Sequence, residues 1–153
     1  MKRVLGYIKA GKDEGATVVT GGERIGDKGY YIQPTIFSNA KPDAKIVREE
    51  IFGPVAVIAK FETDEEALKL ANDSIYGLST NVFTSNLNRA INFANNAESG
   101  SVYVSLLNIS LVYISYSPSV KVNVASFPDP QHTFGGFKQS GFGKDLGKDA
   151  LEA

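Results

Sequence analysis

The sequence predicts an α/β fold with a parallel open sheet flanked by helices. Three runs rich in β-branched or aromatic residues, at residues 55–61, 79–83 and 101–104, have the composition of strands. The segments between these runs carry apolar residues at helical spacing and are long enough to form crossover helices. This alternation predicts two right-handed crossovers on one parallel sheet, and 153 residues are enough for a single domain.

The residues before these runs predict one helix and two short strands. Residues 2–14 have apolar side chains at helical spacing, followed by a glycine that stops the helix: Val4, Leu5, Ile8 and Gly15. Residues 17–20 are mostly β-branched and predict a strand that ends at a pair of glycines. Residues 30–33 precede a proline, which cannot donate to a ladder, and therefore predict an edge or irregular strand.

Three further helices are predicted from their capping residues and apolar stripes. Thr63 with Glu66 three residues later forms a capping-box pattern, which starts a helix over residues 63–72. Residues 86–97 form the next helix, and a short polar helix over residues 144–152 follows a glycine-rich loop. The inward-facing residues of the first two helices are Ala67, Leu68, Ala71, Leu87, Ala90, Ile91 and Ala94.

Composition excludes several classes of function. A net charge of −1 provides no field to attract nucleic acid or an anionic membrane, so neither is an expected partner. The chain contains no cysteine, which excludes a disulfide, a thiolate metal site and a cysteine nucleophile within it, and no metal site is predicted. No secretory signal pattern is present at the first residues, and we expect a cytoplasmic protein.

Residues 49–55, Glu-Glu-Ile-Phe-Gly-Pro-Val, resemble a signature motif of the aldehyde dehydrogenase superfamily. Three further segments resemble the family in order and spacing: residues 5–8 with the Gly21-Gly22 pair, residues 72–78, and residues 134–141. One such motif alone is weak, but four in order over most of the chain are specific. Residues 1–153 are therefore similar to a C-terminal portion of the family's catalytic domain.

The resemblance implies an NAD(P)-dependent enzyme that oxidises a small-molecule aldehyde to a carboxylic acid. In the family, a cysteine thiolate attacks the aldehyde and hydride passes to the nicotinamide. That cysteine, the general-base glutamate and the dinucleotide-binding domain lie upstream of the matched region, so we expect no activity from this chain alone. The parent enzyme is expected to be a homo-oligomer. Two alternatives are a non-catalytic short protein that binds full-length subunits, and a pseudogene product.

Three cofactor-binding roles are carried over from the resemblance. Glu50 would accept hydrogen bonds from the nicotinamide ribose hydroxyls, which suits a carboxylate with two acceptor oxygens. Phe52 and Leu78 would line the nicotinamide side of the pocket with apolar surface. On the residues alone, Glu50 could equally be a solvated carboxylate at a helix end, and Phe52 could be an ordinary core side chain.

The remaining implied site residues lie near the C-terminal end. Phe134 would face both the cofactor and the substrate tunnel, although a phenylalanine beside two glycines could also simply cover a turn. Asn123 and Phe127 fall in the family's substrate-facing loop and would contact the aldehyde.

Residues 104–121 do not fit the resemblance. The family passes from a Ser-Val-Tyr-Val strand directly into an asparagine-containing loop, and without this segment Tyr103 would join Val122 in that way. The segment is apolar and has no charge before Lys121, whereas functional insertions are usually polar surface loops. We interpret residues 104–121 as a non-family insertion, either a translated retained intron or a lineage-specific loop.

Sequencing the transcript across the Tyr103 codon distinguishes these origins. The intron hypothesis predicts a message that lacks the codons for residues 104–121. A uniform message that contains them would contradict it.

Overall fold

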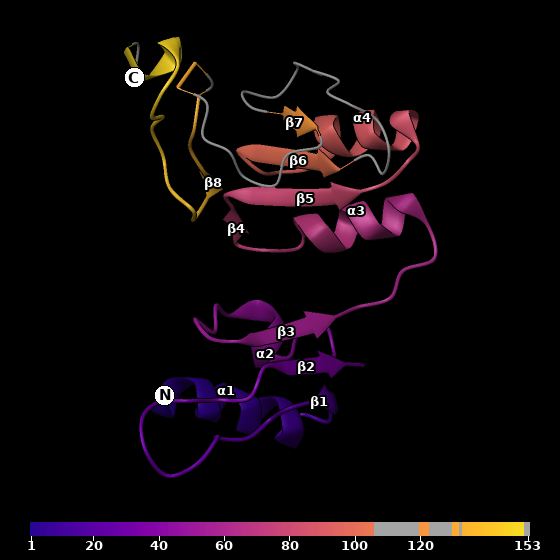
Figure 1. Ribbon diagram of the computed structural model, residues 1–153. Helices are drawn as coiled ribbons and strands as arrows, with labels where there is room; N and C mark the ends of the chain where they lie inside the picture. The colour runs from indigo at the N-terminus through magenta and orange to yellow at the C-terminus, as the bar shows by residue number, and fades with distance from the viewer. Residues whose placement is uncertain (106–119, 123–129, 132, 152–153) are drawn as a thin grey trace. The chain divides into compact units, whose positions relative to one another are not determined.

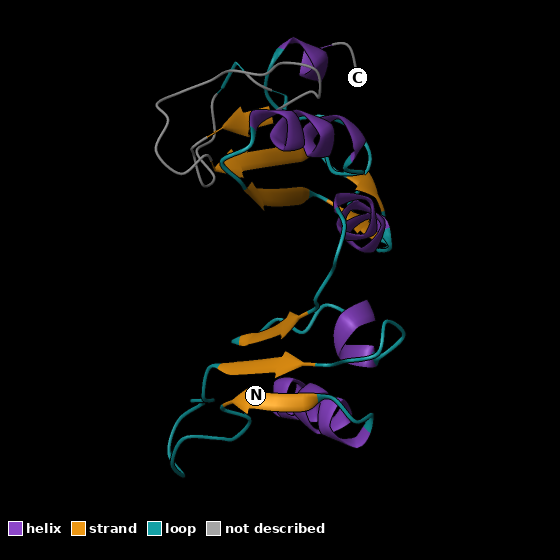
Figure 2. Cartoon of the chain, turned by 90° about the vertical axis from the view of Figure 1, so that its right-hand side faces the viewer, coloured by secondary structure: helices purple, strands orange, loops and turns teal. Residues whose placement is uncertain are grey.

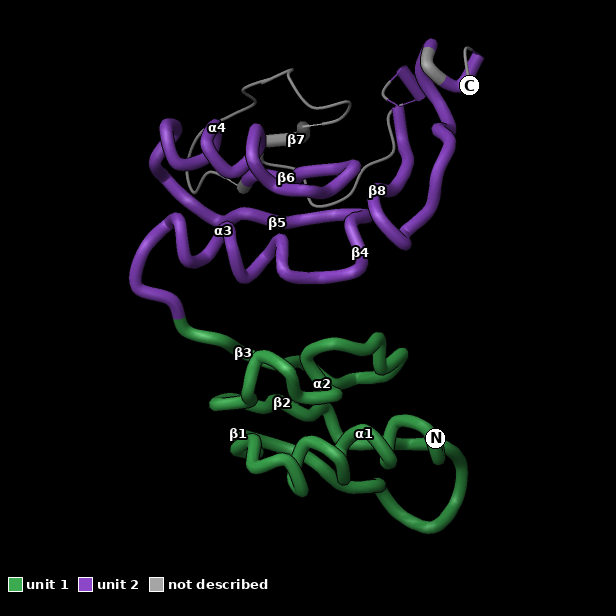
Figure 3. The backbone as a smooth tube through the Cα atoms, turned by 180° about the vertical axis from the view of Figure 1, so that it is seen from behind, with its two compact units in different colours: residues 1–60 green, residues 61–153 purple. Residues whose placement is uncertain are grey.

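The computed structural model describes residues 1–105, 120–122, 130–131 and 133–151. The chain divides into two compact units, residues 1–60 and residues 61–153, which we call the N-terminal and C-terminal units (Figure 3). Each unit combines helices with a small three-stranded sheet that contains parallel strands (Figure 1). The predicted α/β fold class is therefore confirmed.

The N-terminal unit consists of α1 (Lys2–Asp13), β1 (Thr17–Thr20), β2 (Thr35–Ser38), α2 (Lys45–Arg48) and β3 (Val55–Ile58). Its strands lie in the order β1-β2-β3, with β1 antiparallel and β3 parallel to β2. The predicted first helix and first strand are confirmed. The third strand ends at Ile58, three residues earlier than predicted.

The edge or irregular strand predicted at residues 30–33 is reduced to an isolated antiparallel β-bridge between Ile32 and Arg24. The regular strand is β2, which begins directly after Pro34 and continues through alternately buried side chains, with Thr35 and Phe37 facing the core. Its first amide donates to the Pro54 carbonyl at 2.8 Å, whereas Tyr30 and Tyr31 are exposed. Proline at the entry to a strand needs no ladder hydrogen bond of its own, so the strand starts after the proline instead of ending before it.

The core of the N-terminal unit lies between α1 and the sheet. Figure 2 shows α1 on one face of this sheet. Phe37 is fully buried against the helix, and a side chain of this size contributes about 1.5–3 kcal/mol on burial. The other buried apolar residues of this cluster are Val4, Tyr7, Ile8, Ala44, Ile46 and Ile51.

The C-terminal unit contains seven labelled helices and strands and one 3₁₀ helix among the described residues. These are α3 (Asp64–Asn72), β4 (Tyr76–Gly77), β5 (Ser79–Phe83), α4 (Leu87–Asn96), β6 (Ser101–Ser105), β7 (Val120–Val122), β8 (Phe137–Lys138) and the 3₁₀ helix η1 (Lys148–Leu151). The polar helix predicted over residues 144–152 is thus shortened to one 3₁₀ turn, because Leu146 and Gly147 both adopt positive φ.

The capping box predicted at the start of α3 is present. The Thr63 hydroxyl accepts a hydrogen bond from the Glu66 amide at 3.1 Å, and the Glu66 carboxylate accepts one from the Glu62 amide at 2.8 Å. Asn86 caps α4 in the same way by accepting from the Arg89 amide at 3.1 Å. Both helix starts predicted from the sequence are confirmed.

One of the two predicted crossovers is confirmed. Strands β5, β6 and β7 pair in parallel, and α4 connects β5 to β6 while packing Ala90 and Ala94 on Val102 and Val104. The predicted crossover through α3 would join β3 of the N-terminal unit to β5 of the C-terminal unit, and it stays a prediction. Strand spacing predicts that strands occur, but it does not identify the edge at which each one pairs.

Both ends of the predicted insertion lie in the sheet of the C-terminal unit. Val104 and Ser105 continue β6, where Val104 is fully buried and pairs with Val82. At the other end, Val120 and Val122 in β7 pair with Val102 and Val104. Residues 106–119 lie outside the described residues, so the insertion stays a prediction.

A cluster around Lys138 joins β8 to the end of α3, and we call it the Lys138 clamp. The Lys138 ammonium donates to the Asn72 carbonyl at 2.7 Å and to the Ser74 carbonyl at 3.1 Å. It also forms a salt bridge of 2.5 Å with the Glu98 carboxylate. The Asn72 amide group extends the clamp, since it donates to the Asn96 carbonyl and accepts from the Glu98 amide, both at 2.9 Å. The clamp thus connects the ends of α3 and α4 to β8.

Lys138→Met is expected to lower the free energy of unfolding by about 1–2 kcal/mol, since two carbonyls and a carboxylate lose a charged donor. Urea unfolding followed by circular dichroism measures this change. Lys69→Met is the matched control, because Lys69 is an exposed lysine on α3 with no side-chain ion pair among the described residues. Equal effects of the two substitutions would contradict the clamp.

Candidate functional site

A strained turn lies between α2 and β3 in the N-terminal unit. Phe52 adopts φ of 53°, in the left-handed region, and its side chain is 73% exposed. This conformation costs a residue with a side chain roughly 1–2 kcal/mol, and a bulky residue adopts it only where the surroundings impose it. Strain of this kind is typical of functional sites. The core interpretation of Phe52 is wrong, because the ring faces solvent.

The first turn of α1 holds this strained turn in place. The Arg3 guanidinium donates to the Glu50 carbonyl at 2.8 Å. Gly53 lies so close to Val4 that a Cβ at position 53 would be 2.7 Å from both Val4 methyl carbons. Only glycine allows this approach, so the path of the chain on either side of Phe52 is fixed by contact with the helix.

The two adjacent carboxylates of this turn differ in their surroundings. Glu49 accepts a hydrogen bond from the Tyr7 hydroxyl at 2.7 Å. Glu50 is exposed, and its carboxylate makes no hydrogen bond or ion pair within the described part of the chain. Glu50, not Glu49, therefore presents two acceptor oxygens to a ligand.

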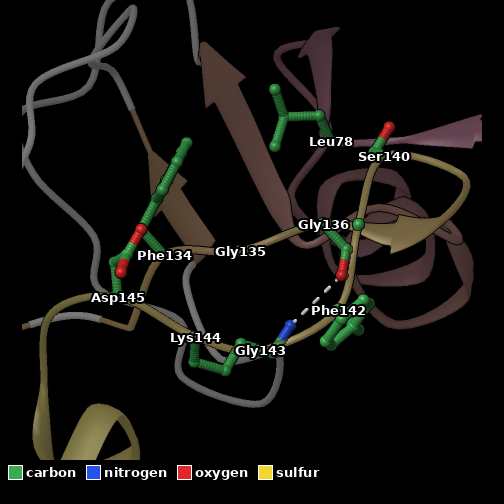
Figure 4. Close-up of a pocket in the computed structure, with 10 residues that line it drawn as sticks. Leu78, Phe134, Gly135, Gly136, Ser140, Phe142, Gly143, Lys144 and Asp145 are labelled. Atoms are coloured by element: carbon green, nitrogen blue, oxygen red, sulfur yellow. Dashed lines mark hydrogen bonds between the residues drawn. The ribbon is translucent and has the colours of Figure 1, made fainter.

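A pocket of about 320 Å³ lies in the C-terminal unit, and Leu78 and Phe134 both line it (Figure 4). The sequence analysis assigned both residues to one site, and the structure brings them together. The other residues that line the pocket are Gly135, Gly136, Ser140, Gly141, Phe142, Gly143, Lys144 and Asp145.

Backbone hydrogen bonds fix the pocket walls. Phe134 and Asp145 exchange two hydrogen bonds, with N···O distances of 2.6 and 2.7 Å. The Leu78 carbonyl accepts from the Ser101 amide at 3.0 Å, so Leu78 lies beside the first residue of β6. Lys144 closes one side, because its ammonium donates to the Gly136 carbonyl at 3.4 Å and lies 4.8 Å from the centre of the Phe137 ring (Figure 4).

Close backbone approaches explain why glycine is needed at positions 100 and 136. A Cβ at Gly100 would lie 1.6 Å from the Gly135 carbonyl oxygen, so no side chain fits there. A Cβ at Gly136 would meet the Ser140 Cβ at 2.7 Å. The loop therefore lies directly on the backbone that enters β6, and Phe134 takes its place at the pocket from this contact. Phe134 therefore lines a pocket, whereas the alternative interpretation from the sequence was that its ring simply covers a turn.

The sequence-predicted residues fall into two groups. Glu50 and Phe52 share the strained turn of the N-terminal unit, and Leu78 and Phe134 share the pocket of the C-terminal unit. Asn123 and Phe127 lie outside the described residues, and their roles stay predictions.

Besides its glycines and Ser140, which falls within the motif at residues 134–141, the pocket contains three residues that were not assigned from the sequence: Phe142, Lys144 and Asp145. The only signal for them is the glycine spacing around residues 141–143, which indicates a loop but no ligand.

The described ranges were also searched for metal and membrane features. They contain no group of three or more His, Cys, Asp or Glu side chains placed to hold a metal ion. Every helix in the same ranges is too short or too polar to span a bilayer.

Replacing Phe52 tests the left-handed turn. Phe52→Gly is expected to give a protein about 1 kcal/mol more stable than Phe52→Ala, because only glycine adopts positive φ without strain. Phe83 is the matched control, since it is also 73% exposed but lies in β5 at ordinary φ, where alanine should be the more stable replacement. The same order at both positions in urea unfolding would contradict the strain at Phe52.

Comparison with known proteins identifies the relatives of this chain. The family model described as the aldehyde dehydrogenase family matches residues 1–112. An aldehyde dehydrogenase of Davidiella tassiana is 52% identical over 149 residues, which cover 97% of this chain and 26% of that protein. A mitochondrial aldehyde dehydrogenase of Leishmania tarentolae is 45% identical and matches 99% of this chain and 27% of its own length.

Solved structures agree with the sequence comparison. The NAD⁺ complex of an aldehyde dehydrogenase from Bacillus cereus is 41% identical, with a TM-score of 0.80 over 99% of this chain and 27% of that chain. The chain thus spans about a quarter of the length of the relatives it matches. With a family model matched over most of its length and this fold, the chain belongs to the aldehyde dehydrogenase family.

Proposed function

We propose that this chain supplies part of the nicotinamide and aldehyde pocket of an NAD(P)-dependent enzyme that oxidises aldehydes to carboxylic acids. The observation that carries the proposal is the strained turn, which presents the free Glu50 carboxylate and the exposed Phe52 ring within three residues. A turn that costs free energy and exposes an aromatic ring has no advantage for stability, so a ligand is the better explanation.

The chemistry of this turn fits a nicotinamide ribose. The ionised Glu50 carboxylate can accept hydrogen bonds from two neighbouring ribose hydroxyls, and bonds to a charged acceptor are stronger than neutral ones. The flat Phe52 ring provides apolar surface for the nicotinamide. Bound NAD(P)⁺ would supply the hydride acceptor. The Bacillus cereus relative, whose structure is an NAD⁺ complex, supports this assignment.

The pocket of the C-terminal unit is proposed to serve the apolar side of the same reaction. Leu78 would lie on the nicotinamide side, and Phe134 would contact both cofactor and substrate. Asn123 and Phe127 are proposed to contact the aldehyde.

The chain has no cysteine, so this polypeptide cannot form the covalent adduct that a thiolate would provide. We propose that it acts only with the remaining three quarters of an aldehyde dehydrogenase, in an enzyme that assembles as a homo-oligomer.

A chimaera tests the proposal. This chain replaces the matching segment of the Davidiella tassiana relative, and NAD⁺-dependent oxidation of acetaldehyde is followed by NADH absorbance. Glu50→Gln is expected to raise the KM for NAD⁺ by roughly 10- to 100-fold, because the charged acceptor is lost. Glu49→Gln is the matched control and should leave the KM unchanged, since glutamine still accepts from Tyr7.

Two results would contradict the proposal. One is a KM for NAD⁺ that responds equally to Glu50→Gln and Glu49→Gln. The other is NADH formation by the purified 153-residue chain alone, because nothing in it replaces the thiolate.

A further inference from the structure

We infer that Arg3 is a positioning residue, which orients Glu50 and Phe52 toward the nicotinamide ribose by holding their turn against α1. This inference rests on the proposed function. Arg3 and Glu50 are 47 positions apart in the sequence, and Arg3 lies in none of the family motifs described above.

The Arg3 guanidinium has one hydrogen-bond acceptor and two aromatic rings as neighbours. Its Nη2 donates to the Glu50 carbonyl at 2.8 Å, and its central carbon lies 5.7 Å from the centre of the Phe52 ring. The same carbon lies 5.7 Å from the centre of the Tyr7 ring, and Tyr7 is buried. A planar guanidinium can donate in its plane while stacking on aromatic faces, which an ammonium group cannot do. Arg3 therefore connects a fixed ring in the core to the exposed ring of the strained turn.

The direction of the Arg3 hydrogen bond leaves the Glu50 carboxylate available. Arg3 binds the backbone carbonyl of Glu50, not its side chain. The neighbouring Glu49 carboxylate is bonded to the Tyr7 hydroxyl at 2.7 Å, and the Lys45 ammonium lies over the same tyrosine ring at 5.3 Å. Arg3 and Lys45 thus have backbone or aromatic partners, and within the described residues the Glu50 oxygens remain free for ribose hydroxyls.

The contacts also explain how Phe52 keeps its conformation. The Val4–Gly53 contact fixes the chain after Phe52, and the Arg3–Glu50 hydrogen bond fixes it before Phe52. Between these two anchors on the first turn of α1, the φ angle of Phe52 is imposed from both sides. Without Arg3, one anchor is lost and the ring loses the cation above it.

A single tryptophan at position 52 reports on this arrangement. The chain contains no tryptophan, so Phe52→Trp introduces the only indole fluorophore into the full 153-residue chain. We expect Arg3→Ala to lower the fluorescence anisotropy of Trp at position 52 and Arg3→Lys to restore it only in part. Lys9→Ala is the matched control, because Lys9 lies on the same helix and pairs with Asp13. Equal anisotropy in the Arg3→Ala and Lys9→Ala backgrounds would overturn the inference.

The chimaera provides a readout that a purely structural role would not move. Arg3→Ala is expected to raise the KM for NAD⁺ roughly tenfold while Lys9→Ala leaves it unchanged, with Arg3→Lys intermediate. Arg3→Gln, which keeps a donor for the Glu50 carbonyl, serves as a second variant if circular dichroism shows that the alanine variant does not fold.

The outcomes separate the two claims. If the anisotropy falls but the KM stays unchanged in a chimaera that responds to Glu50→Gln, Arg3 does not position the cofactor and the inference is overturned. If Glu50→Gln itself leaves the KM unchanged, the proposed function fails, whereas the anisotropy comparison still decides whether Arg3 holds the turn.

Discussion

The C-terminal unit depends on the satisfaction of carbonyl groups at the end of α3. The last carbonyls of a helix have no partner within it, and here the Asn72 carbonyl at the end of α3 and the Ser74 carbonyl just beyond the helix accept from the Lys138 ammonium. The donor comes from a segment more than sixty residues later, so the same interaction closes a long loop. Gly77 and Ser140 reinforce it through a hydrogen bond of 2.9 Å between the Gly77 amide and the Ser140 hydroxyl. Because β4 and β8 are joined in this way, the glycine loop that carries Phe134 reaches Leu78 and a pocket exists.

In the N-terminal unit, by contrast, the turn at Phe52 lowers local stability. Phe52 adopts a backbone conformation that glycine would adopt at lower cost, and it exposes a ring that the core would bury. Contacts with the first turn of α1 offset this cost. Under the proposed function, a strained turn that a neighbouring helix supports is pre-organised, since little ordering remains for a ligand to induce.

The sequence predicted those elements whose signals are local. The Thr63–Glu66 capping box predicted the start of α3, and apolar spacing predicted α1 and α4, because these signals lie within one or two helical turns. It missed α2, which has only four residues and no periodicity, and it predicted a strand at residues 30–33, where Ile32 forms an isolated bridge and β2 begins only after Pro34. The pairing of β2 with both β1 and β3 depends on tertiary packing that no local pattern encodes.

The candidate site residues also divide into those that the sequence indicated and those that required the structure. The resemblance pointed to Leu78 and Phe134 as members of one site, and in the structure both residues line one pocket. Arg3 could not be found from the sequence, because its contacts with the turn are to Glu50 and Phe52, 47 and 49 residues away, and an arginine near a helix start is common. The free state of Glu50 also required the structure, since the sequence does not show that Glu49, and not Glu50, accepts from the Tyr7 hydroxyl.

The end of β6 has a consequence for a chain that lacks residues 104–121. A valine follows Tyr103 in the chain as it stands, and a valine would also follow Tyr103 if residues 104–121 were removed, because Val122 would take the place of Val104. Either valine could occupy the buried position opposite Val82, so β6 can be completed in both forms. The pairing of β6 with β5 would therefore need no change of register in a chain without residues 104–121.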